Sequence, residues 1–348
     1  MKPFVIDYLR SRKTEITDTE VEGKVFFSGL SCNFLHVPCA ERLFQVLSFQ
    51  KHAKETNKRE LFNHLFGHQC LSSSATQDFL SRDSGEKKTF RLSIKTSGKW
   101  RRKIDSTKLA ESLSRALKKT SSKLSVNLRS PDVELCIQIT ESFVFVGVPQ
   151  GSLLSIRNYH HVNGLRSTVC DAMVHLAELQ CGEIVADITC GSGSILVEAS
   201  HSLLPESLFC VGFDCNPDTL LSAKRNFDYC QKVDGLHSLC DLICLHASAK
   251  SFRWADVNRI VADLPFGNQH GNDSDIKKVL FPNVIEILAK FFVSSENDKK
   301  IAILLLSDEH RVEFIQCLKE SAANVTIEDY RLSLGYTDAA ILKIVCLQ

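Results

Sequence analysis

The chain has 348 residues, 44% of them hydrophobic and 24% charged, which is typical of an ordinary globular protein with two or three domains. Its longest apolar run, Ile301–Leu306, is far too short to cross a bilayer, and the first twelve residues lack the pattern of a signal peptide. The 14 cysteines contain no CxxC pair, so we expect free thiols in a reducing compartment, the cytosol or nucleus, and no metal.

The net charge of +1 conceals one strongly basic segment. Residues 85–130 contain 14 Lys and Arg against three acidic residues, a charge of +11 that leaves −10 for the rest of the chain. This segment favours binding of an anionic polymer, although a solvated basic helix face has the same composition. The candidate phosphate contacts are Lys99, Arg101, Arg102, Lys103, Lys118 and Lys119.

The first 150 residues mix strand and helix patterns. Residues 1–66 indicate an α+β region with a strand at 23–27 and a helix at 39–49, and residues 67–89 indicate a linker or long loop. The basic module at 90–150 follows. Its predicted elements are strands at 90–94, 125–128 and 133–147, and a helix that begins after a Ser106 or Thr107 cap and ends near 120.

From residue 151 onward, strands and helices alternate regularly. The first helix has Ser167 or Thr168 as its cap and ends near Leu179. Strands are predicted at 184–188, 208–214, 242–246, 259–263, 301–307, 325–333 and 339–346, and helices at 194–204, 217–230, 281–292 and 310–321. This alternation predicts an α/β domain at 151–348, with a parallel sheet covered on both faces and a final antiparallel hairpin.

The segment Asp187-Ile188-Thr189-Cys190-Gly191-Ser192-Gly193 lies between a buried strand and a helix. Glycines at such a turn let a ligand approach the backbone and the unpaired N–H groups at the helix start. A dinucleotide site would have a third glycine at 196, but this position is Leu196. Asp214, at the end of the second strand, can accept both hydroxyls of an adenosine ribose, or alternatively cap the next helix.

The segment Asp263-Leu264-Pro265-Phe266 ends the fourth strand beside the same predicted crevice. The exocyclic amine of a nucleobase is a poor nucleophile, because its lone pair is delocalised into the ring. The Asp263 carboxylate can hold the hydrogens of such an amine and orient it toward a sulfonium methyl group. Pro265 rigidifies the turn, and Phe266 offers a face on which a base can stack. A plain strand-end turn is the alternative interpretation.

In combination, these motifs resemble those of the THUMP-domain RNA guanine-N2 methyltransferases. The resemblance rests on Asp-x-x-Cys-Gly-Ser-Gly at 187–193, Asp-Leu-Pro-Phe-Gly at 263–267, Gly-Leu-Arg-Ser-Thr at 164–168, and the end of the basic module at 127–134. It implies a class I, Rossmann-like methyltransferase sheet at 151–348. It also implies an N-terminal α+β region that contains a THUMP-like RNA-binding module at 90–150 and an incomplete ferredoxin-like part at 1–66.

The resemblance further implies S-adenosyl-L-methionine as methyl donor and the guanine 2-amino group of a structured RNA, a tRNA or a small nuclear RNA, as acceptor. It implies a small zinc-ribbon activator protein as heterodimer partner, and action in the nucleus or, alternatively, the cytoplasm. By position, Asp187, Cys190, Gly191 and Gly193 would line the methionine half of the cofactor, and Asp214 the ribose. Asp263 to Phe266 would form the catalytic turn. Arg166 would hold the methionine carboxylate or a phosphate, or form a structural ion pair.

Two departures from this family leave alternatives open. The family usually has an acid after the third strand for the adenine amine, but this chain has Leu245-His246-Ala247-Ser248, so the main chain or Ser248 must recognise adenine. The N-terminus lacks the usual opening strand and glycine-rich turn, as a shortened form with weaker RNA binding would. The alternatives are an adenine-N6 or glutamine-amide methyltransferase, or a non-catalytic THUMP RNA-binding protein with a decayed pocket.

Overall fold

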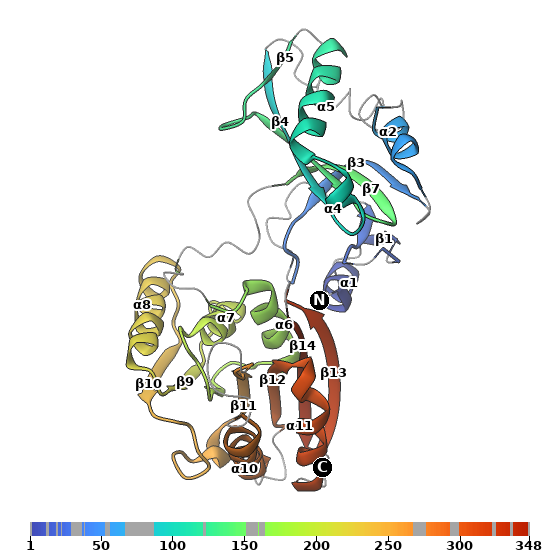
Figure 1. Ribbon diagram of the computed structural model, residues 1–348. Helices are drawn as coiled ribbons and strands as arrows, with labels where there is room; N and C mark the ends of the chain where they lie inside the picture. Colours follow the sequence, from blue (N-terminus) through green and yellow to red (C-terminus); the bar gives the residue numbers. More distant parts are fainter. Residues whose placement is uncertain are drawn as a thin grey trace. The chain divides into compact units, whose positions relative to one another are not determined.

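The protein consists of two compact units, each described here by itself: residues 1–41 with 155–348, and residues 42–154 (Figure 1). The computed structural model describes residues 2–11, 14–18, 20–21, 23–28, 37, 39–52, 56–66, 87–120, 123–150, 159, 164–266, 276–292, 299–321, 325–334 and 337–346. The units divide the chain differently from the predicted ranges, because part of the predicted 1–66 region belongs to the sheet of the second unit. Of the predicted linker at 67–89, residues 67–86 lie outside the described residues, and Lys88 and Thr89 belong to β4.

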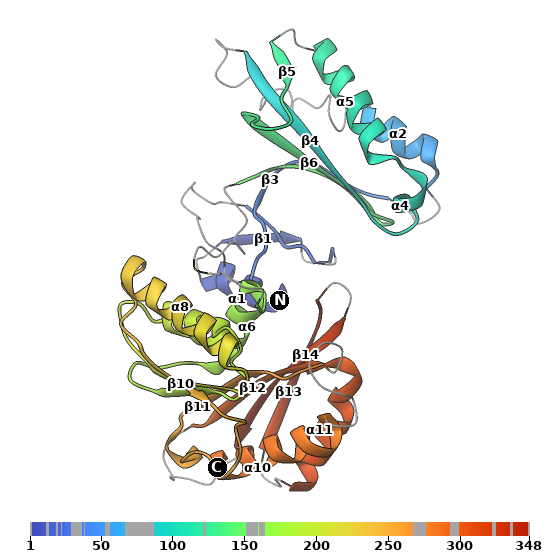
Figure 2. The ribbon, with the colours of Figure 1, turned by 60° about the vertical axis from the view of Figure 1, so that its left-hand side comes forward.

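Residues 42–154 form a five-stranded sheet in the order β3-β7-β6-β4-β5. Figure 2 shows α2 and α5 beside this sheet. Together with the short α4, they share one apolar core with the sheet, around Phe90, Trp100 and Leu113. β4 runs parallel to β5 and β6, while β7 is antiparallel to β3 and β6. The elements are β3 (Phe44–Lys51), α2 (Lys58–Phe66), β4 (Lys88–Thr96), α4 (Trp100–Lys103), α5 (Ser106–Thr120), β5 (Leu124–Val126), β6 (Val133–Ile139) and β7 (Phe143–Pro149).

Three sequence predictions in this unit are wrong. The apolar stripe at 39–49 is not a helix: its second half is β3, because pairing with β7 and the contact of the Phe44 ring with Phe145 at 5.3 Å outweigh the helical spacing. The predicted strand 133–147 is two strands, since the Thr140 hydroxyl accepts from the Phe143 N–H and closes a turn. The cap of α5 is Asp105, whose Oδ1 accepts from the N–H groups of the second and third helical residues.

The other unit is built on a seven-stranded sheet in the order β10-β9-β8-β11-β12-β14-β13. The first five strands in this order are parallel, and β14 lies antiparallel between β12 and β13, as the predicted hairpin requires. The strands are β8 (Ile184–Asp187), β9 (Phe209–Asp214), β10 (Leu239–Cys244), β11 (Arg259–Asp263), β12 (Ile301–Ser307), β13 (Val325–Ser333) and β14 (Asp338–Cys346).

Helices cover both faces of this sheet, and the strands divide their side chains between two cores. Val261 and Ile303 point into the core with α6, α7 and α8, whereas their neighbours Ala262 and Leu304 point into the core with α10 and α11. This alternation is the two-residue period of a strand buried on both faces. The helices are α6 (Ser167–Ala177), α7 (Ser194–Ser202), α8 (Pro217–Val233), η1 (Trp254–Asp256), η2 (Ile276–Leu280), α10 (Phe281–Phe292) and α11 (Asp308–Ser321).

The N-terminal residues of the chain add a helix and a small two-stranded sheet to this unit. They form α1 (Lys2–Ser11), β1 (Glu15–Asp18) and β2 (Phe26–Ser28). Phe4 of α1 is buried in the same core as α6 and contacts His175 with a ring-centroid distance of 5.6 Å. The strand predicted at 23–27 is therefore present, shifted to Phe26–Ser28.

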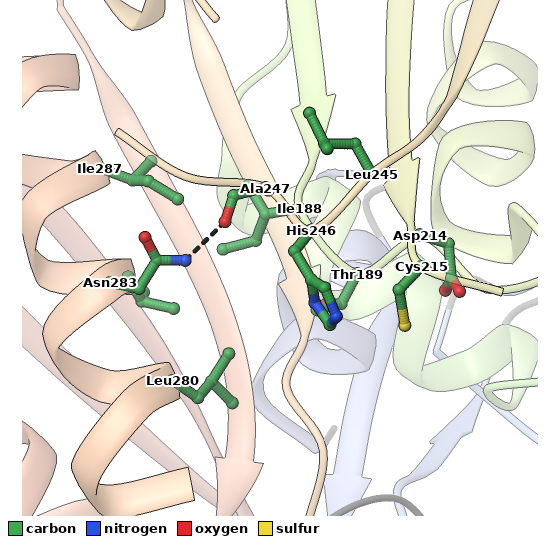
Figure 3. Close-up of a pocket in the computed structure, with 11 residues that line it drawn as sticks. Ile188, Thr189, Asp214, Cys215, Leu245, His246, Ala247, Leu280, Asn283 and Ile287 are labelled. Atoms are coloured by element: carbon green, nitrogen blue, oxygen red, sulfur yellow. Dashed lines mark hydrogen bonds between the residues drawn. The ribbon is translucent and has the colours of Figure 1, made fainter. Parts of the chain in front are cut away.

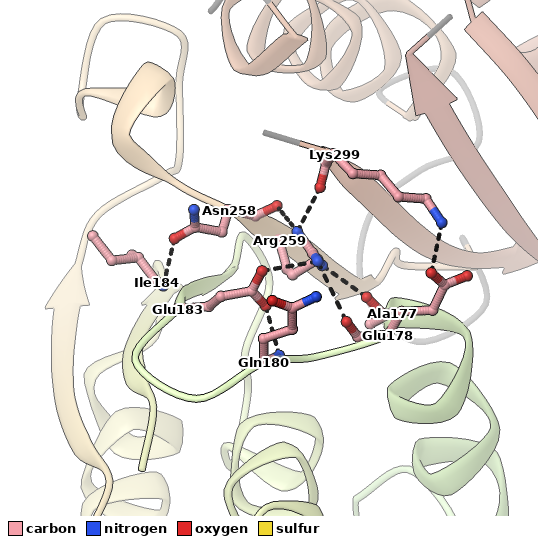
Figure 4. Close-up of polar contacts among 8 residues, drawn as sticks. All are labelled: Ala177, Glu178, Gln180, Glu183, Ile184, Asn258, Arg259 and Lys299. Carbon is pink, nitrogen blue, oxygen red and sulfur yellow. Dashed lines mark hydrogen bonds and ion pairs between the residues drawn. The ribbon is translucent and has the colours of Figure 1, made fainter. Parts of the chain in front are cut away.

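A buried arginine organises the amino-terminal edge of the large sheet (Figure 4). Arg259 begins β11, its side chain is 4% exposed, and it pairs with Glu183 at 2.8 Å. Its remaining N–H groups donate to main-chain carbonyls at 2.7–3.3 Å, those of Ala177, Glu178, Asn258 and Lys299. All five guanidinium donors are thus used, and two of them satisfy carbonyls at the end of α6.

Candidate active site

Three carboxylates meet at the carboxyl edge of the sheet, the edge where open α/β sheets bind ligands. Asp187 ends β8, Asp214 ends β9 and Asp263 ends β11, and these three strands are neighbours. Thr189 links two of the strand ends, because its Oγ1 donates to the main-chain oxygen of Asp263 at 3.0 Å. The sequence prediction that these three aspartates share one edge is confirmed by the strand order.

Asp187 is the most buried of the three, at 1% exposure. Its Oδ1 accepts from the Thr189 N–H at 3.0 Å, whereas Oδ2 has no hydrogen-bond partner among the described residues. Burial, and the charges of Asp263 and Asp214, raise the pKa of Asp187 well above its usual range. A buried oxygen without a donor is costly, so this site suits a ligand that brings a cationic or N–H group.

The glycine turn after β8 has two glycines with different tasks. Gly191 has φ +51° and open space where a Cβ would stand, and its N–H donates to Asp214 Oδ2 at 2.9 Å. Gly193 has φ +76°, and an added Cβ would lie 3.1 Å from the Cβ of Ala223 in α8. Gly191 therefore leaves room for a ligand, while Gly193 lets helix α8 pack closely against the turn. The sequence pattern predicts that both glycines make room for a ligand, whereas in the structure the space beside Gly193 is filled by Ala223 of α8.

Asp263 is half-buried, and burial raises the pKa of its carboxyl group to about 7. The next residue, Leu264, is buried and donates its N–H to the Leu305 carbonyl of β12 at 2.8 Å, which is a structural role. Pro265 and Phe266 are half-buried, and Phe266 packs against the core that contains α6. Of the four residues predicted as catalytic, Asp263 is the one whose functional group has an unusual environment.

A pocket lies beside these strand ends (Figure 3). It is lined by Ile188, Thr189, Asp214, Cys215, Leu245, His246, Ala247, Leu280, Asn283, Val284 and Ile287. Asn283 of α10 donates from Nδ2 to the Ala247 carbonyl at 2.5 Å, and its Oδ1 accepts from no described residue. Ser248, predicted to contact adenine, does not line this pocket; its N–H instead donates to the Ser251 hydroxyl at 2.8 Å.

Two further predicted cofactor contacts have structural partners. The Cys190 thiol is buried against β9, where a Cβ on Gly212 would lie 2.8 Å from its sulfur. Arg166 is half-exposed, pairs with Glu41 at 3.2 Å and donates to the Leu334 carbonyl at 3.4 Å. The structural ion pair, which is one of the two sequence interpretations of Arg166, is thus present.

The predicted cap of α6 is wrong, since the helix begins at Ser167 and Arg166 precedes it without a side-chain cap.

The predicted RNA contacts separate into two groups at the two ends of α5. Arg101, Arg102 and Lys103 are exposed on α4, and Lys118 and Lys119 are exposed in the last turn of α5, roughly 18 Å farther along the helix. Lys99 differs from both groups. It is half-buried, donates from Nζ to the Thr56 carbonyl at 3.2 Å, and lies over the Trp100 ring.

Sequence reasoning missed Thr189, Cys215 and Asn283. Thr189 lies inside the predicted motif, and its hydroxyl could have been considered as a link between strands. Cys215 follows the predicted ribose acid directly. Asn283 had no local signal, because it reaches the pocket from a helix far along the chain.

Residues 155–335, about half of the chain, match the family described as RMKL-like, methyltransferase domain. The chain belongs to this methyltransferase family. Solved structures agree with its fold. TrmN from Thermus thermophilus superposes with a TM-score of 0.68 at 18% identity, covering 99% of this chain and 96% of that one. SMU.472, solved in complex with SAH, gives 0.72 at 14% identity, covering 98% and 94%. The predicted class I fold is confirmed.

Curated relatives are RNA methyltransferases. The U6 snRNA (guanine-N(2))-methyltransferase THUMPD2 of Mus musculus is 26% identical over 309 residues, which are 78% of this chain and 57% of the relative. The tRNA (guanine(10)-N2)-dimethyltransferase of Methanocaldococcus jannaschii is 28% identical over 197 residues, 53% of this chain and 54% of the relative. The chain spans about half the length of the curated relatives it matches. The resemblance found in the sequence motifs is confirmed.

Among the described helices, none is both long and apolar enough to span a membrane.

Proposed function

We propose that this chain is an S-adenosyl-L-methionine-dependent methyltransferase that acts on the guanine 2-amino group in a structured RNA. The observation that carries the proposal is Asp263, a half-buried carboxyl with its pKa raised to about 7, on the strand next to Asp187. The names of the relatives support guanine N2 as the acceptor, in a small nuclear RNA or a tRNA.

The strand-end residues fit the cofactor by their chemistry. The unpartnered Oδ2 of Asp187 suits the ammonium group of the methionine half, and the open space at Gly191 suits its close approach to the backbone. Asp214 accepts hydrogen bonds from Gly191, Asn216 and Thr219, so one of the four lone-pair positions of its carboxylate remains for a ribose hydroxyl. When bound, S-adenosyl-L-methionine supplies an electrophilic methyl group on a sulfonium.

The chain's own contribution to the reaction is positioning. The Asp263 carboxylate accepts hydrogen bonds from the amine, which removes the rotational freedom of the nitrogen and directs its lone pair. Thr189 fixes the end of β11 by its hydrogen bond to the Asp263 carbonyl. Phe266 packs against the core that contains α6 and so anchors the turn. The proton leaves the nitrogen after methylation, and a carboxylate with a pKa near 7 can accept it at neutral pH.

The decisive test is the identity of the methylated nucleoside. The purified chain, with a small zinc-ribbon activator present, is incubated with labelled cofactor and folded RNA, and the RNA is digested and analysed by mass spectrometry. We expect N2-methylguanosine. N6-methyladenosine, label in a protein glutamine, or RNA binding without any transfer would each overturn the guanine assignment in favour of one of the alternatives named above.

The pocket beside Asp214 offers Asn283 as the residue that recognises adenine. Its Nδ2 is held by the Ala247 carbonyl, so its Oδ1 is the acceptor available to a 6-amino group. Replacing Asn283 by Ala should weaken S-adenosylhomocysteine binding about tenfold, the value of one good hydrogen bond. It should also abolish the preference over S-inosylhomocysteine, which presents an oxygen at this position.

Calorimetry of both ligands on wild type and variant measures this effect, and Val279→Ala, at an exposed neighbouring position, is the control. An unchanged ratio of the two dissociation constants in Asn283→Ala would show that the main chain alone reads the base.

RNA binding is proposed to use the exposed cations of α4. Replacing Arg101, Arg102 and Lys103 together by Gln should weaken RNA binding and reduce the slope of log K against log salt by about two to three, since each phosphate contact contributes roughly 0.7–0.9. Cofactor affinity should stay the same. RNA binding measured at several salt concentrations tests this.

The matched control removes three exposed cations from α8 in the other unit: Lys224, Arg225 and Lys232. Equal slopes for the two triple variants would mean that only total charge matters and that α4 is a solvated face.

We also propose a zinc-ribbon activator protein as partner. The edge strand β10 is the surface to which it would bind. Within the described sheet, β10 pairs only with β9, so its outer edge can accept another strand. Leu239 begins β10 and Leu245 directly follows it, and their side chains are 60% and 46% exposed, so apolar surface is available at both ends of this strand. We propose the nucleus as the site of action for a small nuclear RNA, with the cytoplasm as the alternative for a tRNA.

A further inference from the structure

A second cluster of titratable side chains lies away from the strand-end site, near the carboxyl ends of helices α7 and α8. It consists of His201 near the end of α7, Cys230 in the last turn of α8, and Asp234 directly after α8. Their candidate ligand atoms all lie within 4.8 Å of one another. From this geometry, we propose that the three side chains bind a zinc ion, a role that goes beyond methyl transfer.

The three ligand atoms are close to the spacing of a zinc site. Tetrahedral zinc with Zn–N and Zn–O near 2.0–2.1 Å and Zn–S near 2.3 Å places its ligand atoms about 3.4–3.6 Å apart. His201 Nε2 and Asp234 Oδ2 are already 3.4 Å apart. The largest separation, at most 4.8 Å, closes with side-chain movements of about 1 Å, because Asp234 is at a partly exposed helix end.

His201 supplies an independent observation. Its Nε2 is buried and makes no hydrogen bond among the described residues, although it lies near Asp234. The distance to the carboxylate is that of an ion pair, but the two groups form no hydrogen bond. A buried nitrogen that faces a thiol and a carboxylate without bonding to either has the arrangement of a metal ligand.

The ring of His201 is held in place by its neighbours. Tyr159 stacks on it with a centroid distance of 6.1 Å and an interplanar angle of 14°. The Tyr159 hydroxyl donates to Glu198 Oε1 at 2.9 Å, and Glu198 lies one turn before His201 on the same face of α7. Such support around a ligand limits its movement and raises metal affinity.

The donor set selects the metal. A thiol and an imidazole disfavour Mg²⁺ and Ca²⁺, which prefer oxygen ligands, and they favour Zn²⁺. Binding releases the thiol proton to solvent, and the fourth position is open to water on the exposed side of Asp234. The sequence spacing does not indicate this site, because the ligands come from two helices separated by β9.

The ion would join two helices that already meet elsewhere, at the start of α7 and the middle of α8. There the Asn226 side chain of α8 donates to the Ser192 carbonyl at 2.9 Å, and Ala223 packs on Gly193. A metal near the carboxyl ends of α7 and α8 would fix the two helices at a second place and so stiffen the glycine turn that precedes α7.

The test uses cobalt as a visible substitute for zinc. The chain is purified without any partner, stripped with a chelator and titrated with Co²⁺. We expect about one equivalent to bind with the visible absorption of tetrahedral cobalt and a near-ultraviolet thiolate-to-cobalt band, both abolished by adding Zn²⁺. Cys230→Ser should lose the thiolate band, while Cys317→Ser, a thiol on the opposite face of the sheet, should keep it.

A second variant covers the case in which Cys230→Ser fails to fold. His201→Gln changes a partly exposed side chain and should weaken Co²⁺ binding at least about tenfold, because one of three protein ligands is lost. Zinc should raise the melting temperature of the wild type but not of His201→Gln. Absence of a thiolate band in the wild type, or equal cobalt affinity in His201→Gln, overturns the proposal.

Discussion

Replacing Asp263 by Asn should reduce methyl transfer at least about 100-fold while leaving cofactor affinity unchanged. The amide has the shape of the carboxylate, but one of its two acceptor atoms becomes a donor, which repels an amine hydrogen instead of holding it. Loss of orientation at a reacting nitrogen typically costs this much in rate. Single-turnover rates and calorimetric cofactor binding measure the two quantities separately.

The same carboxyl group should make the wild-type rate depend on pH. Burial raises the pKa of Asp263 to about 7, and the ionised form is the one that accepts hydrogen bonds from the amine. The rate should therefore rise with pH through about 7 and become constant about one unit higher. A flat profile over this range would mean that Asp263 does not act in its ionised form.

The effect on stability should have the opposite direction. With the folded pKa near 7 and the unfolded pKa near 3.8, the folded state holds more protons between these values, so this group's contribution to stability falls as pH rises through that window. Asp263→Asn removes the penalty of a buried charge and should melt at or above the wild-type temperature at pH 8. Asp338→Asn, at an exposed position, is the control for both measurements. A variant that melts early would indicate a structural role.

Local sequence patterns were sufficient for the sheet that carries the site. Strands such as β12, with seven consecutive buried residues, are continuous apolar runs that have few other interpretations, and α10 has the predicted bounds of residues 281–292. In the other unit, β3 could not be predicted, because its partner β7 is about a hundred residues away and supplies the hydrogen bonds that decide its conformation.

In the candidate site, too, some residues could be predicted from local patterns and others depend on distant parts of the chain. Asp187, Asp214 and Asp263 could be predicted, since each ends a strand and strand ends of a parallel sheet meet at one edge. The roles of Gly193, Cys190 and Asn283 depend on which helix or strand packs against them. Local sequence patterns carry no information on this packing. They therefore cannot distinguish a glycine that makes room for a helix, such as Gly193, from one that makes room for a ligand, such as Gly191.

The largest loss of stability is expected from Arg259→Met. The variant leaves Glu183 without its cation and removes the donors to four carbonyl groups at the edge of the sheet opposite to Asp263. Breaking a buried pair in this way costs about 3–5 kcal/mol. For a domain of this size, this corresponds to a fall in melting temperature of roughly 6–20 °C. Thermal unfolding followed by circular dichroism measures it.

Two comparisons show where this loss comes from. Arg253→Met removes an arginine that pairs with Asp256 at 3.1 Å but is 86% exposed, and it should change the melting temperature little, because exposed pairs contribute little. Arg259→Met combined with Glu183→Met should lose less than Arg259→Met alone, since no stranded carboxylate remains. If the double variant is as unstable as the single one, the carbonyl groups at the end of α6 and beside β12 carry the cost. The buried arginine would then act mainly as a helix cap.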